Sequence, residues 1–112
     1  MSVNQRQHFR IQYPTEDRAK LEVNGAFFPI IDLSQSGLKF QSSNHFPNPG
    51  QIFLMTVNLL HGHKHTTKMK VVRVDPPFVM MIFEHPIDKF YIENEKNHLE
   101  KEHGKFSSAG AY

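Results

Sequence analysis

Two short groups of residues in this 112-residue chain carry charged and hydrogen-bonding side chains at spacings that could serve a binding site. The first is an arginine pair, Arg6 and Arg10, in a polar N-terminal stretch. The second is Asp32, Ser34 and Gly37, at the end of an apolar run. The planar fork of arginine matches guanine O6 and N7, or a phosphate, in bidentate fashion. A carboxylate accepts hydrogen bonds from the donors on the Watson–Crick edge of guanine, and a serine hydroxyl donates to phosphate.

The spacing of the second group indicates how it would be presented. Asp32 and Ser34 are two residues apart, so in a strand they point to the same side at a separation of about 7 Å. If Ile31 and Leu33 fill a core on the opposite side, the polar pair lies on an outer wall. Gly37 tolerates a positive φ in the turn and leaves room for a ligand. In the alternative interpretation, Asp32, Ser34 and Gly37 only organise a turn, and the arginines are solvated charges.

A series of β-type runs must position these groups. Turn sequences such as Asn24-Gly25 and Pro47–Gly50 separate the runs. Short strands with no helical pattern between them predict an all-β antiparallel barrel or sandwich. Apolar residues change parity between Val71 and Val72, which predicts a bulge there. The predicted strands are Lys20–Val23, Ala26–Leu33, Leu38–Gln41, Gln51–Leu60, His65–Val74 and Phe78–Phe83.

The C-terminal part changes in character. Residues 87–103 lack Gly and Pro, and Ile87, Phe90 and Tyr91 lie at helical spacing, while Leu99 follows Ile92 by seven residues. This pattern predicts one amphipathic helix that lies on the barrel or projects from it. We therefore expect a mobile N-terminal arm over residues 1–19, a barrel with its helix over 20–103, and a frayed tail over 104–112.

Composition and charge limit the class of protein. The chain has no cysteine, no N-terminal apolar stretch and no run of the roughly 20 apolar residues that a membrane span needs, so we expect a cytoplasmic protein without membrane insertion. Residues 1–83 hold nine Lys and Arg against five Asp and Glu, whereas residues 84–105 hold four against six. This mild basicity suits a small anionic ligand and is too weak to indicate general nucleic-acid binding.

The two groups together resemble the signature of the PilZ family: Arg-x-x-x-Arg from Arg6 to Arg10, then Asp-x-Ser-x-x-Gly from Asp32 to Gly37. The resemblance covers roughly residues 5–103 and implies a six-stranded antiparallel PilZ-type β-barrel with a C-terminal α-helix. It also implies a bacterial receptor for the second messenger cyclic di-GMP, bound by Arg6, Arg10, Asp32, Ser34 and Gly37. Ligand binding would draw the arm onto the barrel and signal to an effector protein in processes such as motility or biofilm formation.

One position departs from the family pattern. Many members carry a further arginine where this chain has Gln5, and that position is associated with binding one or two ligand molecules. The stoichiometry therefore stays open. Two other functions also stay open: a PilZ-like protein-interaction adaptor that ignores the nucleotide, and, less favoured, a single-strand nucleic-acid binder, since no basic stripe interleaved with aromatic residues is present.

Other sequence patterns predict no further chemistry. His61, His63 and His65 could share a strand face and hold zinc or nickel, but Gly62 marks a hairpin tip, where we expect solvated histidines and no metal site. The chain has no Gly-x-Ser-x-Gly elbow, no glycine-rich phosphate loop and no His-Glu-x-x-His motif. We therefore expect a binding protein, with no catalytic residues and no cofactor other than the ligand itself.

Overall fold

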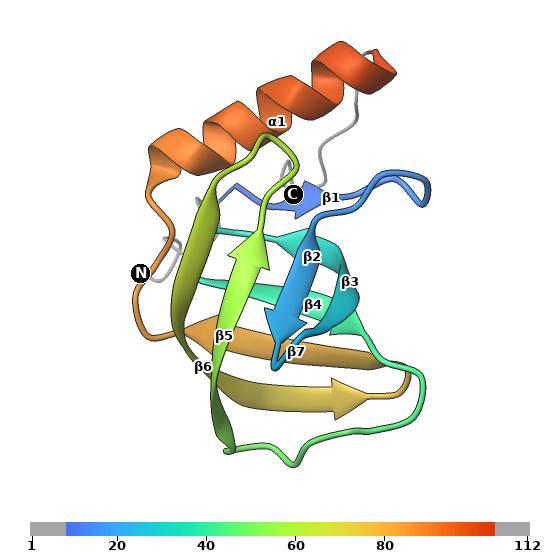
Figure 1. Ribbon diagram of the computed structural model, residues 1–112, viewed down its shortest axis with the longest axis vertical. Helices are drawn as coiled ribbons and strands as arrows, with labels where there is room; N and C mark the ends of the chain where they lie inside the picture. Colours follow the sequence, from blue (N-terminus) through green and yellow to red (C-terminus); the bar gives the residue numbers. More distant parts are fainter. Residues whose placement is uncertain (1–8, 105–112) are drawn as a thin grey trace, which may run out of the picture.

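Residues 9–104, the part that the computed structural model describes, form a closed six-stranded antiparallel barrel with one extra strand and a C-terminal helix (Figure 1). This architecture confirms the predicted fold class. The elements are β1 (Ile11–Gln12), β2 (Lys20–Val23), β3 (Ala26–Leu33), β4 (Gly37–Gln41), β5 (Ile52–Asn58), β6 (Lys64–Asp75), β7 (Phe78–Phe83) and α1 (Lys89–His103).

The barrel closes through β3, which pairs with different neighbours along its length. Its first half pairs with β2 and its second half with β4, so the order β3-β2-β5-β6-β7-β4 returns to β3. The extra strand β1 also pairs with the second half of β3, with Ile11 opposite Leu33 and Gln12 opposite Asp32. Strand β1 was not among the predicted strands, because it lies in the N-terminal segment expected to be an extended arm. Arg6 lies outside the described residues.

Two bulges decide which side chains face the core. In β3 the register shifts between Ile30 and Asp32, so Ile31 is an extra residue. Ile30 and Leu33 are consequently fully buried, and Ile31 is only half-buried. The expectation that Ile31 and Leu33 fill the core together was therefore wrong for Ile31. In β6 the predicted bulge is confirmed, because the register shifts between Val71 and Arg73.

The helix α1 lies across one end of the barrel, beside the β5–β6 hairpin tip and β1 (Figure 1). Asp88 caps it, since its side chain accepts a hydrogen bond from the Phe90 amide at 2.8 Å. The buried residues of the helix are Ile92, Glu95 and Leu99, at spacings of three and four, and Phe90 points to solvent. No helix in the described part is long and apolar enough to cross a membrane.

Glu95 is a fully buried acid that ties three parts of the chain together. Its Oε2 accepts hydrogen bonds from the Tyr13 hydroxyl at 2.6 Å and the Leu60 amide at 2.9 Å. Its Oε1 accepts from the His61 amide at 3.1 Å and lies 2.7 Å from His61 Nδ1. Burial, then the charge of Glu95 and the bond to it, raises the pKa of Tyr13 well above its ordinary value. This network fastens α1 to the hairpin tip and to the segment after β1.

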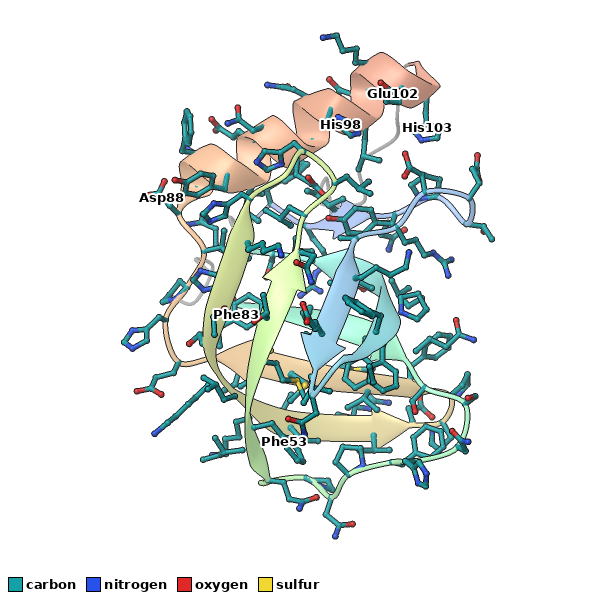
Figure 2. The ribbon with its side chains drawn as sticks, viewed as in Figure 1. Phe53, Phe83, Asp88, His98, Glu102 and His103 are labelled. Carbon is teal, nitrogen blue, oxygen red and sulfur yellow. The ribbon has the colours of Figure 1, made fainter. Side chains whose placement is uncertain are left out.

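The hairpin-tip histidines also pack against their surroundings, which corrects the expectation that they are solvated. The His63 ring stacks on Tyr91 at a centroid distance of 3.5 Å and an interplanar angle of 4°. His65 Nε2 lies 2.7 Å from the His85 carbonyl oxygen. At the far end of the helix, His103 Nε2 lies 2.9 Å from Asp17 Oδ2 (His103 is labelled in Figure 2). Within residues 9–104 no group of three or more potential metal ligands forms.

The stacked His63 predicts a loss of stability in mild acid. Partial burial, with the neighbouring His61 and His65, lowers the pKa of His63. A histidine in the unfolded chain has a pKa near 6.5. Below that pH, His63 is protonated more fully in the unfolded chain than in the folded chain, so the free energy of unfolding falls. His63→Phe keeps a ring on Tyr91 and is expected to flatten this dependence in urea unfolding measured across pH. His45→Phe, at an exposed loop position, serves as the control. If the free energy of unfolding of His63→Phe depended on pH as steeply as that of the native chain, His63 would not be the source of the acid sensitivity.

Candidate ligand-binding site

A row of side chains crosses the outer wall of the barrel through Asp32. Residues opposite each other on neighbouring strands point to the same face of a sheet. Gln12 on β1 pairs with Asp32 on β3, and Asp32 pairs with Lys39 on β4. Lys39 in turn lies opposite Met80 on β7, which lies opposite Arg73 on β6. The row therefore sets an acid between the N-terminal segment and a lysine.

Asp32 is held by two cations. Arg10 Nη1 lies 2.7 Å from its Oδ1, and Lys39 Nζ lies 3.8 Å from its Oδ2. The Asp32 side chain is only 7% exposed, whereas Arg10 and Lys39 are 41% and 30% exposed. Asp32 thus faces outward as predicted, but the two cations cover it. The structure brings Arg10 from the first predicted group into direct contact with the second group.

Ser34 takes the turn role that the sequence analysis left open. Its hydroxyl accepts a hydrogen bond from the Ser36 amide at 3.3 Å and donates to the Gly37 carbonyl oxygen at 3.4 Å. Its own amide donates to the same carbonyl at 2.9 Å. Ser34 is 3% exposed. Its hydrogen bonds hold the β3–β4 turn, and this turn keeps Asp32 opposite Lys39.

Gly37 is required for a different reason from the one expected. It is the first residue of β4 and does not have the positive φ that a left-handed turn residue would have. A Cβ atom at Gly37 would instead collide with the backbone carbonyl oxygen of Met81. The missing side chain therefore allows β4 and β7 to approach closely beneath the site.

Gly37→Ala is accordingly expected to destabilise the barrel by about 1–3 kcal/mol, because a backbone oxygen cannot move aside as a flexible side chain can. Urea unfolding measures the change. Ser36→Ala, at the exposed neighbouring position, should alter the free energy of unfolding by no more than about 0.5 kcal/mol. Equal stabilities of Gly37→Ala and the native chain would show that β7 has room for the methyl group.

An open pocket of about 370 Å³ lies over this part of the wall. It brings together four of the five predicted site residues, Arg10, Asp32, Ser34 and Gly37. The other lining side chains were not predicted as site residues. Lys39 could have been found by counting across the Ser34–Gly37 turn, whereas Gln12, Val72, Met80 and Ile82 reach the pocket through long-range strand pairing. These further lining residues include Gln12, Lys39, Val72, Met80 and Ile82.

On the outer wall of the barrel, Arg10 from the N-terminal segment contacts Asp32 beside an open pocket. The sequence profile of the PilZ domain matches residues 4–89, and the chain belongs to this family. The family is one of cyclic di-GMP receptors, and its domains bind ligands or act as adaptors rather than as enzymes.

The chain also resembles solved structures. Among them is the crystal structure of the "Legionella Uncharacterized Protein Lpg0364", which superposes with a TM-score of 0.52 at 14% identity over 81% of this chain and 85% of that chain. At this identity the likeness supports the fold alone. Among curated proteins, none matches the chain by sequence.

Proposed function

We propose that this protein is a receptor for cyclic di-GMP, bound by Arg6, Arg10, Asp32, Ser34 and Gly37. The observation that carries the proposal is the contact of Arg10 with Asp32 at 2.7 Å, in a pocket that also holds the Ser34–Gly37 turn. In a PilZ chain, this contact supports the proposal that the arginine fork and the carboxylate share one guanine base.

The side chains have complementary tasks toward such a ligand. The carboxylate of Asp32 can accept hydrogen bonds from the Watson–Crick donors of guanine, which adenine cannot supply in the same pattern. Arg10 is partly exposed and can turn its fork from Asp32 to guanine O6 and N7 or to a phosphate. Lys39 adds positive charge beside the two phosphates. Arg6 would join them when the N-terminal arm closes over the ligand.

The proposed output is a change at the surface. A ligand that bridges Arg6 and Arg10 to the barrel wall orders the arm, and the ordered arm offers an effector protein a different surface. The protein would act in the bacterial cytoplasm, in processes such as motility or biofilm formation. The adaptor alternative keeps the effector and omits the nucleotide.

A thermal-shift comparison of nucleotides tests the proposal. Cyclic di-GMP at about 100 times its dissociation constant should stabilise the fold by about 2.7 kcal/mol and raise the midpoint by several degrees. Cyclic di-AMP has the same charge and ring but no guanine edge, so it should leave the midpoint nearly unchanged. Equal shifts of the midpoint with both nucleotides would mean that the site recognises phosphate and not guanine. No shift with either would favour the adaptor.

A further inference from the structure

The outer face of β5, β6 and β7 carries an apolar surface that borders the ligand site and extends beyond it to β5. Ile52 and Leu54 on β5 are 60% and 65% exposed, and Val72 and Ile82 on the neighbouring strands are 46% and 45% exposed. An open groove of about 320 Å³ runs between Ile52 and Ile82. Clustered exposed apolar side chains on a small domain commonly mark an interaction site.

This surface is continuous with the ligand site through one register row. Gly37 on β4 lies opposite Ile82 on β7, Ile82 lies opposite Lys70 on β6, and Lys70 lies opposite Ile52 on β5. Ile82 and Val72 also line the pocket over Asp32. A molecule lying in the groove would therefore border a ligand in the pocket.

The charge of the groove indicates what it accepts. Lys68 lies opposite Leu54 and Lys70 opposite Ile52, so a lysine stands beside each of the most exposed apolar side chains. Within residues 9–104, both lysines are exposed and neither forms an ion pair. Glu84 lines one edge and pairs with His85 at 3.8 Å. Met69 and Phe83 also line the groove and are buried (Phe83 is labelled in Figure 2).

We infer that this surface, the β5–β7 groove, docks a partner protein through a segment whose apolar side chains alternate with carboxylates. The apolar side chains would cover Ile52, Leu54 and Ile82, and the carboxylates would pair with Lys68 and Lys70. A symmetric contact with a second copy would set these lysines against each other. An anionic membrane surface attracts clusters of about four to eight basic residues, whereas this face has two lysines and a glutamate.

A selection of displayed random peptides on the full chain, with and without cyclic di-GMP, tests the inference. Enriched peptides are expected to combine large apolar residues with Asp or Glu. Their affinity should fall at least about tenfold in Leu54→Thr and in Lys68→Glu/Lys70→Glu, in line with losses at interface hot spots. Phe27→Thr is the matched control, since Phe27 is 57% exposed on β3, a strand outside the β5–β7 face that carries Leu54. Threonine is compatible with strands, so both threonine variants should fold.

The inference would be overturned if no peptides were enriched or if the enriched peptides were basic. It would also be overturned if Leu54→Thr and Lys68→Glu/Lys70→Glu bound the enriched peptides as tightly as the native chain does. Self-association lost in Leu54→Thr would assign the groove to a second copy, and binding of vesicles of phosphatidylcholine with phosphatidylglycerol, lost in the lysine variant, would assign it to a membrane. The groove does not depend on the proposed receptor function. Acidic apolar peptides binding a chain that ignores cyclic di-GMP would support the groove and reject the receptor.

Discussion

Arg10→Ala is expected to weaken cyclic di-GMP binding by at least about 100-fold, a loss of about 2.8 kcal/mol, and to leave the barrel folded. Arg10 reaches Asp32 at 2.7 Å from outside the barrel, so its removal deletes the fork that would share the guanine with that carboxylate. The cost to stability should be about 1–3 kcal/mol, because the nearly buried Asp32 loses the Arg10 hydrogen bond but keeps Lys39 at 3.8 Å. Calorimetric titration measures the affinity and urea unfolding the stability.

Two comparisons sharpen this test. Arg10→Lys keeps the charge but loses the bidentate fork, so it should recover only a minor part of the affinity. Lys20→Ala removes a positive charge from β2 at a position that does not line the pocket, and it should bind as the native chain does. Native-like affinity in Arg10→Ala would remove this residue from the site.

Glu95→Ala is expected to have the largest effect on stability, a loss of about 3–5 kcal/mol. The substitution leaves the amides of Leu60 and His61 and the Tyr13 hydroxyl without their buried acceptor. The helix would then lose its attachment to the hairpin tip and to the segment that follows Arg10. Urea unfolding followed by circular dichroism measures the loss.

Glu95→Gln keeps the fold measurable if the alanine variant does not fold. The amide retains one acceptor oxygen but turns a donor toward donors, so an intermediate loss of about 2–3 kcal/mol is expected. Glu93→Ala is the matched control on the same helix, because Glu93 is exposed and, among residues 9–104, its one ion pair is with Lys89 at 3.7 Å. It should change stability by about 0.5 kcal/mol or less. Equal effects of the two alanine variants would contradict the role given to Glu95.

Local patterns in the sequence predicted most of the barrel. The strands Lys20–Val23, Ala26–Leu33 and Phe78–Phe83 have the predicted bounds, because turn residues or prolines delimit each of them. The bulge after Val71 was visible as a change of apolar parity. In contrast, β1 has two residues, too few for any periodicity, and it forms because the second half of β3 has an edge open to it.

The parts of the site that the sequence did not reveal depend on contacts between distant residues. The need for glycine at position 37 comes from the Met81 carbonyl on β7, which no local pattern around Gly37 shows. Because Ile31 is an extra residue in the β3–β4 pairing, Ile30 takes the buried position that simple alternation gave to Ile31. Glu95 falls on the buried side of α1 between Ile92 and Leu99, and a charged residue at that spacing was the available signal for a buried network.

The most direct test of the receptor assignment is a calorimetric titration of the full chain with cyclic di-GMP. The arrangement of Arg10 and Asp32 predicts saturable binding with a dissociation constant of about a micromolar or tighter, equivalent to about 8 kcal/mol or more. The molar ratio at saturation would also decide between one and two bound ligand molecules. A chain that is folded by circular dichroism and releases or absorbs no binding heat at several temperatures would contradict the assignment.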